Sequence, residues 1–217
     1  MKKVLILLIL LSTLFSASAQ RKQIDSFKTV LKKSLKDTDR YNALRQLSGL
    51  YFTSRPDSLI ILQQEALFLA QKNHWLVNEA RALANLAIGY QKMGDYATAI
   101  RYDLKSLRID EITNRAYGIV TINMNIGALY GQKGDYKRSL NYFLKTQKLF
   151  EEFAQSHTSL TADQKSTKPG ILQDLADTYL SLRNLDSAKY CLDAAYKSEK
   201  DINDHEYIGN IQHDLGI

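Results

Sequence analysis

The chain has 217 residues, 45% of them hydrophobic and 24% charged, which is an ordinary globular composition with enough length for a substantial core. Its formal net charge of +6 contains no block of like charge, so we interpret it as a solvated surface and expect no nucleic-acid binding within this segment. The single cysteine, Cys191, excludes an internal disulfide bond.

The N-terminus has the three parts of a secretory signal peptide. Residues 1–3 are positively charged, residues 4–15 are apolar apart from two hydroxyl side chains, and residues 17–19 have the small side chains that signal peptidase needs. We therefore expect residues 1–19 to be removed before Gln20 and the mature chain to be exported, to a periplasmic or other extracytoplasmic place. An uncleaved membrane anchor is the alternative, but a spanning helix needs about 20 apolar residues.

Residues 20–40 are predicted to form an N-terminal capping segment. Ile24, Phe27, Leu31 and Leu35 recur at the spacing of one helix face. We expect a helix over 24–36 that covers the apolar surface of the first repeat.

A repeated pattern begins near residue 41. Each copy has an apolar residue, a small residue directly after it and a tyrosine three residues further on. The tyrosines lie 39, 40 and 49 residues apart, at Tyr51, Tyr90, Tyr130 and Tyr179. The small residues, which should let a second helix approach closely, are Ser48, Ala87, Gly127 and Ala176.

The residues after each tyrosine predict a tight turn between two helices. Gly94-Asp95 and Gly134-Asp135 combine a residue suited to the left-handed conformation with one that caps the next helix, and Asn184 is assigned the left-handed position in the fourth copy. A second set of small residues follows, at Ala99, Ser139 and Ala188. Each copy is therefore predicted to be helix A, turn and helix B, over about 41–75, 76–114, 116–154 and 169–203.

Two segments depart from the regular repeat. Residues 155–169 lack apolar periodicity and are predicted to form a surface loop, either a tolerated insertion or, less simply, a functional lid. Residues 204–217 match the start of a partial fifth repeat, with Leu215-Gly216 forty residues after Leu175-Ala176. Because no helix B follows to cover its apolar side chains, we expect a truncated product or the N-terminal part of a longer protein. The alternative is that this helix is itself the cap.

These motifs resemble the tetratricopeptide repeat family over residues 41–217, in a variant with a repeat of about forty residues. The resemblance implies an all-α, right-handed superhelical solenoid of antiparallel helix pairs, with about four full repeats, a capping helix and a partial fifth repeat. The chain lacks the tryptophan near the repeat start and the closing proline of the shorter consensus. Residues 37–41 are also similar to the start of exported sensor regions in Bacteroidetes-type histidine kinases and helix-turn-helix regulators.

In this family helix A lines a concave groove, and the resemblance implies that a protein or peptide ligand binds there. The implied groove positions are Arg45, Phe52, Arg81, Asn85, Ile88, Lys92, Asn125, Gln132, Gln173 and Asp177. An equally weighted alternative is that Asn85 and Asn125 join neighbouring repeats. Gly49 and Asp174 break the pattern with which chaperone-binding members hold a terminal carboxylate, so we do not expect that clamp.

No catalytic residue, cofactor or metal site is expected. The four histidines form no His-Glu-x-x-His pattern, no cysteine pair exists, and the glycines within 127–134 have the wrong spacing for a phosphate loop.

The leading hypothesis is a non-catalytic protein–protein interaction module, serving as the extracytoplasmic sensory region of a signal-transduction protein. The alternatives are a free-standing periplasmic scaffold or assembly factor, and a small-ligand or enzymatic domain that uses Asp174 and Asp177. A membrane link is expected only through a span downstream of this chain.

Overall fold

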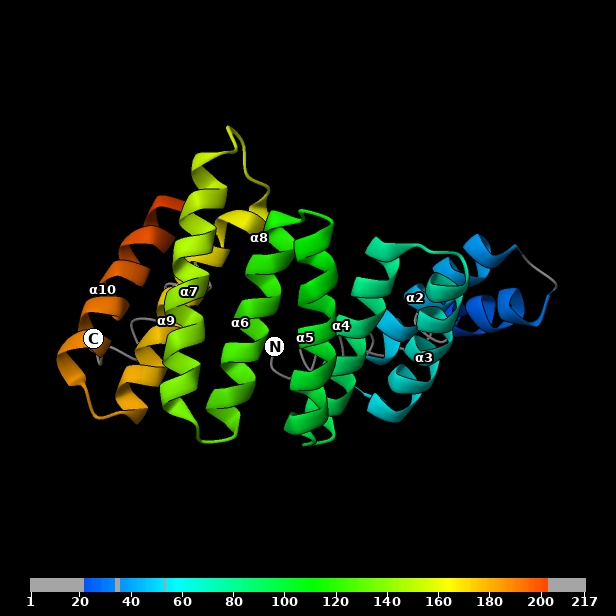
Figure 1. Ribbon diagram of the computed structural model, residues 1–217, viewed down its shortest axis with the longest axis horizontal. Coiled ribbons are helices and arrows are strands. Elements are labelled where there is room, and N and C mark those ends of the chain that lie inside the picture. The colour runs from blue at the N-terminus through cyan, green and yellow to red at the C-terminus, as the bar shows by residue number, and fades with distance from the viewer. Residues whose placement is uncertain (1–21, 34–35, 53, 203–217) are drawn as a thin grey trace, which may run out of the picture. The chain divides into compact units, whose positions relative to one another are not determined.

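The computed structural model describes residues 22–33, 36–52 and 54–202, and this part of the chain contains helices and no strand (Figure 1). The predicted signal peptide (1–19) and partial fifth repeat (204–217) lie outside the described residues. None of the described helices is long and apolar enough to cross a lipid bilayer. The all-α prediction is confirmed, and the chain divides into two compact units, with the boundary in the sequence between Gly94 and Asp95.

Unit 1 contains a helical segment over 22–32 followed by α2 (Asp37–Tyr51), α3 (Pro56–Lys72) and α4 (Leu76–Lys92). Its core is apolar, with Leu44, Ala66 and Ala70 fully buried. Leu31 from the 22–32 helix packs against the same core, as expected of a capping helix. The α2–α3 pair is also joined by a buried hydrogen bond of 2.5 Å, which the Gln63 side-chain amide donates to the Ser48 hydroxyl.

Unit 2 contains α5 (Tyr96–Ile112), α6 (Ala116–Gln132), α7 (Tyr136–Gln155), α8 (Ala162–Lys165), α9 (Thr167–Ser181) and α10 (Leu185–Ile202). Figure 1 shows α7, α9 and α10 side by side, with α6 on the other side of α7. Aromatic and aliphatic side chains from these helices form one cluster, which includes Phe143, Phe150, Ile171, Leu175 and Leu192.

The predicted turns are confirmed in the second and third repeats. Gly94 and Gly134 both have φ of +78°, a left-handed conformation that glycine adopts without steric cost. The carboxylates that follow them cap α5 and α7, because Asp95 accepts a hydrogen bond from the Thr98 backbone N–H and Asp135 accepts one from Arg138.

The prediction for the fourth turn was wrong by one residue. Arg183, not Asn184, takes the left-handed conformation, with φ of +59°. Asn184 is the cap instead, since its side-chain oxygen accepts a hydrogen bond of 3.1 Å from the Ser187 backbone N–H. Asparagine is common both as a left-handed residue and as an N-cap. Here it is the N-cap, because its side chain binds the backbone N–H three residues later, at Ser187.

Replacing Asn184 with alanine is expected to destabilise the protein by about 1 kcal/mol, because it leaves a donor at the start of α10 without its partner. Asn184→Asp keeps the acceptor and is the matched control. Urea unfolding followed by circular dichroism measures both, and equal losses in the two variants would show that the cap contributes nothing.

The small residues predicted at the helix contacts are buried. Ser48, Ala87 and Ala176 are at most 3% exposed, and so are Ala99, Ser139 and Ala188 on the second helix of each pair. One close contact went unnoticed in the sequence: a Cβ atom at Gly89 would lie 2.6 Å from Cγ1 of Ile60. Gly89 therefore lets α4 approach α3 closely.

Two predicted boundaries differ from the structure. The capping segment was predicted to run to residue 40, but α2 begins at Asp37, whose carboxylate lies at the positive end of the helix. The predicted loop over 155–169 is partly helical, since it contains α8 and the first turn of α9. Thr161 and Gln164 form a capping box that starts α8, and this pattern is visible in the sequence.

Candidate functional site

Residues of α2 and α4, together with one residue of α3, line an open hollow of about 340 Å³ in unit 1. We call it the basic hollow, and its lining residues are Arg45, Ser48, Gly49, Phe52, Leu59, Arg81, Ala84 and Asn85. Four of the predicted groove residues are in this set: Arg45, Phe52, Arg81 and Asn85. The sequence prediction placed them on two different helices, and the structure brings all four to one hollow.

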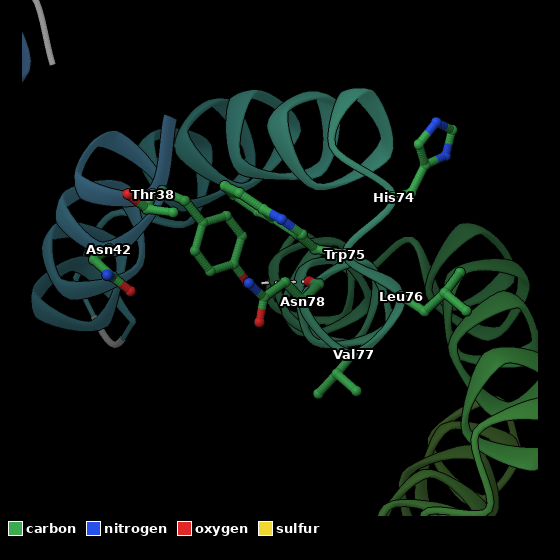
Figure 2. A pocket seen from close by; sticks show the side chains of 8 residues that line it. Thr38, Asn42, His74, Trp75, Leu76, Val77 and Asn78 are labelled. Atoms are coloured by element: carbon green, nitrogen blue, oxygen red, sulfur yellow. Dashed lines mark hydrogen bonds between the residues drawn. The ribbon is translucent and has the colours of Figure 1, made fainter. Parts of the chain in front are cut away.

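A second hollow of about 450 Å³ lies at the N-terminal ends of the same two helices. We call it the aromatic hollow, and its lining residues are Thr38, Tyr41, Asn42, His74, Trp75, Leu76, Val77 and Asn78. Figure 2 shows Thr38 and Asn42 on α2 facing the start of α4, where Trp75 and Asn78 lie. Because the two hollows follow successive turns of α2 and α4, together they form what we call the α2–α4 trough.

Two aromatic side chains that line the aromatic hollow contact each other. The rings of Tyr41 and Trp75 meet edge to face, with centroids 6.0 Å apart. The Tyr41 hydroxyl donates a hydrogen bond of 3.0 Å to the Asn78 backbone oxygen, which ties α2 to α4. Burial raises the pKa of Tyr41, while the nearby guanidinium groups of Arg45 and Arg81 act in the opposite direction.

Two cations of unit 1 outside the trough lining are ion-paired: Arg40 pairs with Glu65, and Lys72 pairs with Asp37 at 2.9 Å. Within the part of the chain that the structure describes, the guanidinium groups of Arg45 and Arg81 form no ion pair or hydrogen bond, although the Arg45 backbone oxygen accepts a hydrogen bond from the Ser48 hydroxyl. Lys92 lies over the Phe52 ring, with Nζ 4.9 Å from its centroid, so a third positive charge stands beside the basic hollow. Ile88, also predicted for the groove, is half-buried on α4.

The remaining predicted groove residues belong to unit 2. Asn125 on α6 and Gln173 on α9 are half-buried, while Gln132 and Asp177 are exposed. On α9, burial, together with the charge of Asp177, raises the pKa of Asp174 to about 7. The assignment of all ten residues to one binding groove stays a prediction.

The sequence prediction missed the aromatic hollow. Trp75 is the only tryptophan of the chain and directly precedes α4, so its position was a usable signal. The equivalent residue before α6 is Arg115, which pairs with Asp110 at 2.7 Å instead of an aromatic ring. An alignment of the repeats emphasises the residues that they share, so a difference such as Trp75 against Arg115 is easily overlooked.

Among the described residues, no group of three histidine, cysteine, aspartate or glutamate side chains could hold a metal ion. His74 and His157 belong to this part of the chain, and the other two histidines lie outside it. The expectation of a protein without catalytic, cofactor or metal site stays a prediction.

Comparison with known proteins supports the fold. A tetratricopeptide repeat model matches residues 78–152, which run from α4 into α7. No curated protein matches the sequence. Among solved structures, BtubC from P. vanneervenii is similar at 17% identity and a TM-score of 0.71, over 88% of this chain and 77% of that one.

Two further structures are similar over part of their length. Aspartyl phosphate phosphatase F from Bacillus subtilis matches at 13% identity and a TM-score of 0.77, over 89% of this chain and 52% of that one. The Rap conjugation gene regulator of plasmid pLS20, in complex with the Phr* peptide, matches at 16% identity and 0.69, over 91% and 53%. At such identities the likeness shows the fold alone, which is that of a tetratricopeptide-like helical solenoid.

Proposed function

We propose that this chain is a non-catalytic interaction module that binds a protein or peptide in the α2–α4 trough. The observation that carries the proposal is the pair of guanidinium groups, Arg45 and Arg81, that line the basic hollow without a partner of their own. Unpaired cations at the edge of a concave, partly aromatic surface have their hydrogen-bonding capacity free for a ligand.

The fold supports this proposal. A tetratricopeptide-like pair of helices uses its small residues for internal packing, so the side chains on the open face of helix A are left for recognition. The Rap regulator was solved with a peptide bound, which shows that a similar fold accommodates one in that protein.

We further propose that the module is the extracytoplasmic sensory region of a signal-transduction protein. The signal-peptide pattern of residues 1–19 supports export, and the resemblance of residues 37–41 to sensor regions supports a signalling role. Export would be tested by mass spectrometry of the chain recovered from the cell envelope, where an N-terminus at Gln20 is expected. An intact residue 1 would contradict cleavage.

Binding in the trough can be tested by photo-crosslinking in the native cell. Benzoylphenylalanine is introduced at Asn42, within the trough, and in a separate variant at the exposed Gln64 of α3 as the matched control. We expect a specific adduct from position 42, identified by mass spectrometry, and none from position 64. Equal adducts from both positions, or none from either, would contradict the proposal.

The same experiment separates signalling from scaffolding. An adduct with a secreted peptide or with an envelope stress protein, together with an altered transcript profile in a deletion strain, supports the sensory role. An adduct with subunits of one envelope complex that fails to assemble in the deletion strain supports the scaffold instead.

A further inference from the structure

We infer that the α2–α4 trough selects extended peptide segments that carry acidic side chains. This inference rests on the proposed function, because it names the chemistry of the ligand for the same trough. It depends on three features of unit 1: the charge of the lining, the length of the trough and the open space above Gly49.

The charge of the lining is wholly positive. None of the residues that line the two hollows is an acid, whereas Arg45 and Arg81 line the basic hollow and Lys92 stands over Phe52 beside it. The acids of α2 and α3 that pair with cations, Asp37 and Glu65, pair elsewhere. A carboxylate on a ligand would therefore meet planar guanidinium groups suited to two parallel hydrogen bonds, with no competing acid in the lining.

The two guanidinium groups belong to one hollow. Arg45 on α2 and Arg81 on α4 both line the basic hollow, and both act to lower the pKa of Tyr41, so the hollow receives positive charge from two helices. A ligand that lies between the two helices can thus use one or two of its carboxylates to bind the guanidinium groups of both helices.

The length and polarity of the trough suit an extended chain. From Thr38 to Phe52, α2 rises by about 21 Å at the usual 1.5 Å per residue, which matches roughly six residues of extended peptide. Asn42, Asn78 and Asn85 line it at intervals. Their amides can donate to and accept from a peptide backbone, which gives affinity independent of the peptide's sequence.

Gly49 keeps the basic hollow open. A Cβ atom at this position would meet no other atom within 4 Å, so a larger side chain there would project into the basic hollow without displacing the protein. Gly49→Leu is therefore a blocking variant. Because glycine is the poorer helix former, the substitution is not expected to destabilise α2.

The experiment uses the full chain and an array of random octapeptides that are acetylated and amidated, so that side chains supply every carboxylate. We expect the bound peptides to be enriched in aspartate and glutamate. A representative acidic peptide should lose at least tenfold in affinity with Arg45→Glu/Arg81→Glu, and should bind more weakly as salt is raised. Gly49→Leu should abolish its binding.

The matched control carries the same change of charge outside the trough. Arg108→Glu/Lys137→Glu alters two exposed cations of unit 2 and should leave the affinity within twofold. Circular dichroism confirms that all variants are folded.

Each other outcome has a distinct meaning. Peptide binding without acidic enrichment overturns this inference and leaves the proposed function standing. Acidic binding that survives both Arg45→Glu/Arg81→Glu and Gly49→Leu overturns it too, because the ligand then lies elsewhere. If peptides bind only when their C-terminus is free, the trough recognises the terminal carboxylate and not acidic side chains. This result also overturns the inference. If no peptide binds and position 42 gives no crosslink, the proposed function itself fails.

Discussion

Replacing Gly127 with leucine is expected to destabilise unit 2 by about 3 kcal/mol, because α6 and α7 have no room for a side chain at this point. A Cβ atom on Gly127 would already lie 3.0 Å from Cδ1 and Cε1 of Phe143. The Phe143 ring is only 3% exposed and belongs to the main core cluster of the unit, so it cannot swing outward without opening that cluster.

A smaller side chain at position 143 should compensate for a larger one at position 127. The fourth repeat has Ala176 and Leu192 at the positions equivalent to Gly127 and Phe143, and both are buried. The double variant Gly127→Ala/Phe143→Leu copies that combination. It should be more stable than the sum of the two single variants by about 1 kcal/mol. Urea unfolding of the four proteins completes the cycle, and strict additivity would show that glycine is not required by the phenylalanine ring.

Asp103→Leu is expected to stabilise the protein, by an amount that grows with pH. Asp103 on α5 is 1% exposed, its Oδ1 atom has no hydrogen-bond partner among the described residues, and burial raises its pKa to about 8. The equivalent positions of the third and fourth repeats carry Phe143 and Leu192, so an apolar side chain fits this place in the repeat.

The sign follows from the two protonation states. Between pH 4 and pH 8 the unfolded chain has lost the Asp103 proton while the folded chain keeps it, so the wild-type protein loses stability as the pH rises through this range. The leucine variant does not lose stability in this way. The difference between its free energy of unfolding and that of the wild type should therefore increase by up to about 1.4 kcal/mol per pH unit. Urea unfolding at a series of pH values measures it.

A second variant separates charge from packing. Asp103→Asn also removes the ionisation, so its pH profile should resemble that of the leucine variant, but its amide gains no apolar contact and should give no advantage at pH 4. Parallel profiles for wild type and Asp103→Leu would mean that Asp103 is already ionised in the folded chain.

The sequence determined the helix pairs because their signals are local. A small residue, a tyrosine and a Gly-Asp turn follow one another within about ten residues, and steric and capping requirements act over that distance. The turns at Gly94-Asp95 and Gly134-Asp135 and the buried small residues were predicted for this reason. The fourth turn was misassigned because asparagine satisfies two local roles equally well.

Only the tertiary structure decided which side chains share a site. Arg45 and Arg81 are 36 residues apart in the chain, and they line the same hollow because α2 and α4 both pack against α3. The same holds for Trp75, which the repeat pattern treats as an irregular residue and the folded unit places against Tyr41. Repeat periodicity fixes what each helix buries, whereas charge and shape on the open face arise from pairs of residues that no local pattern links.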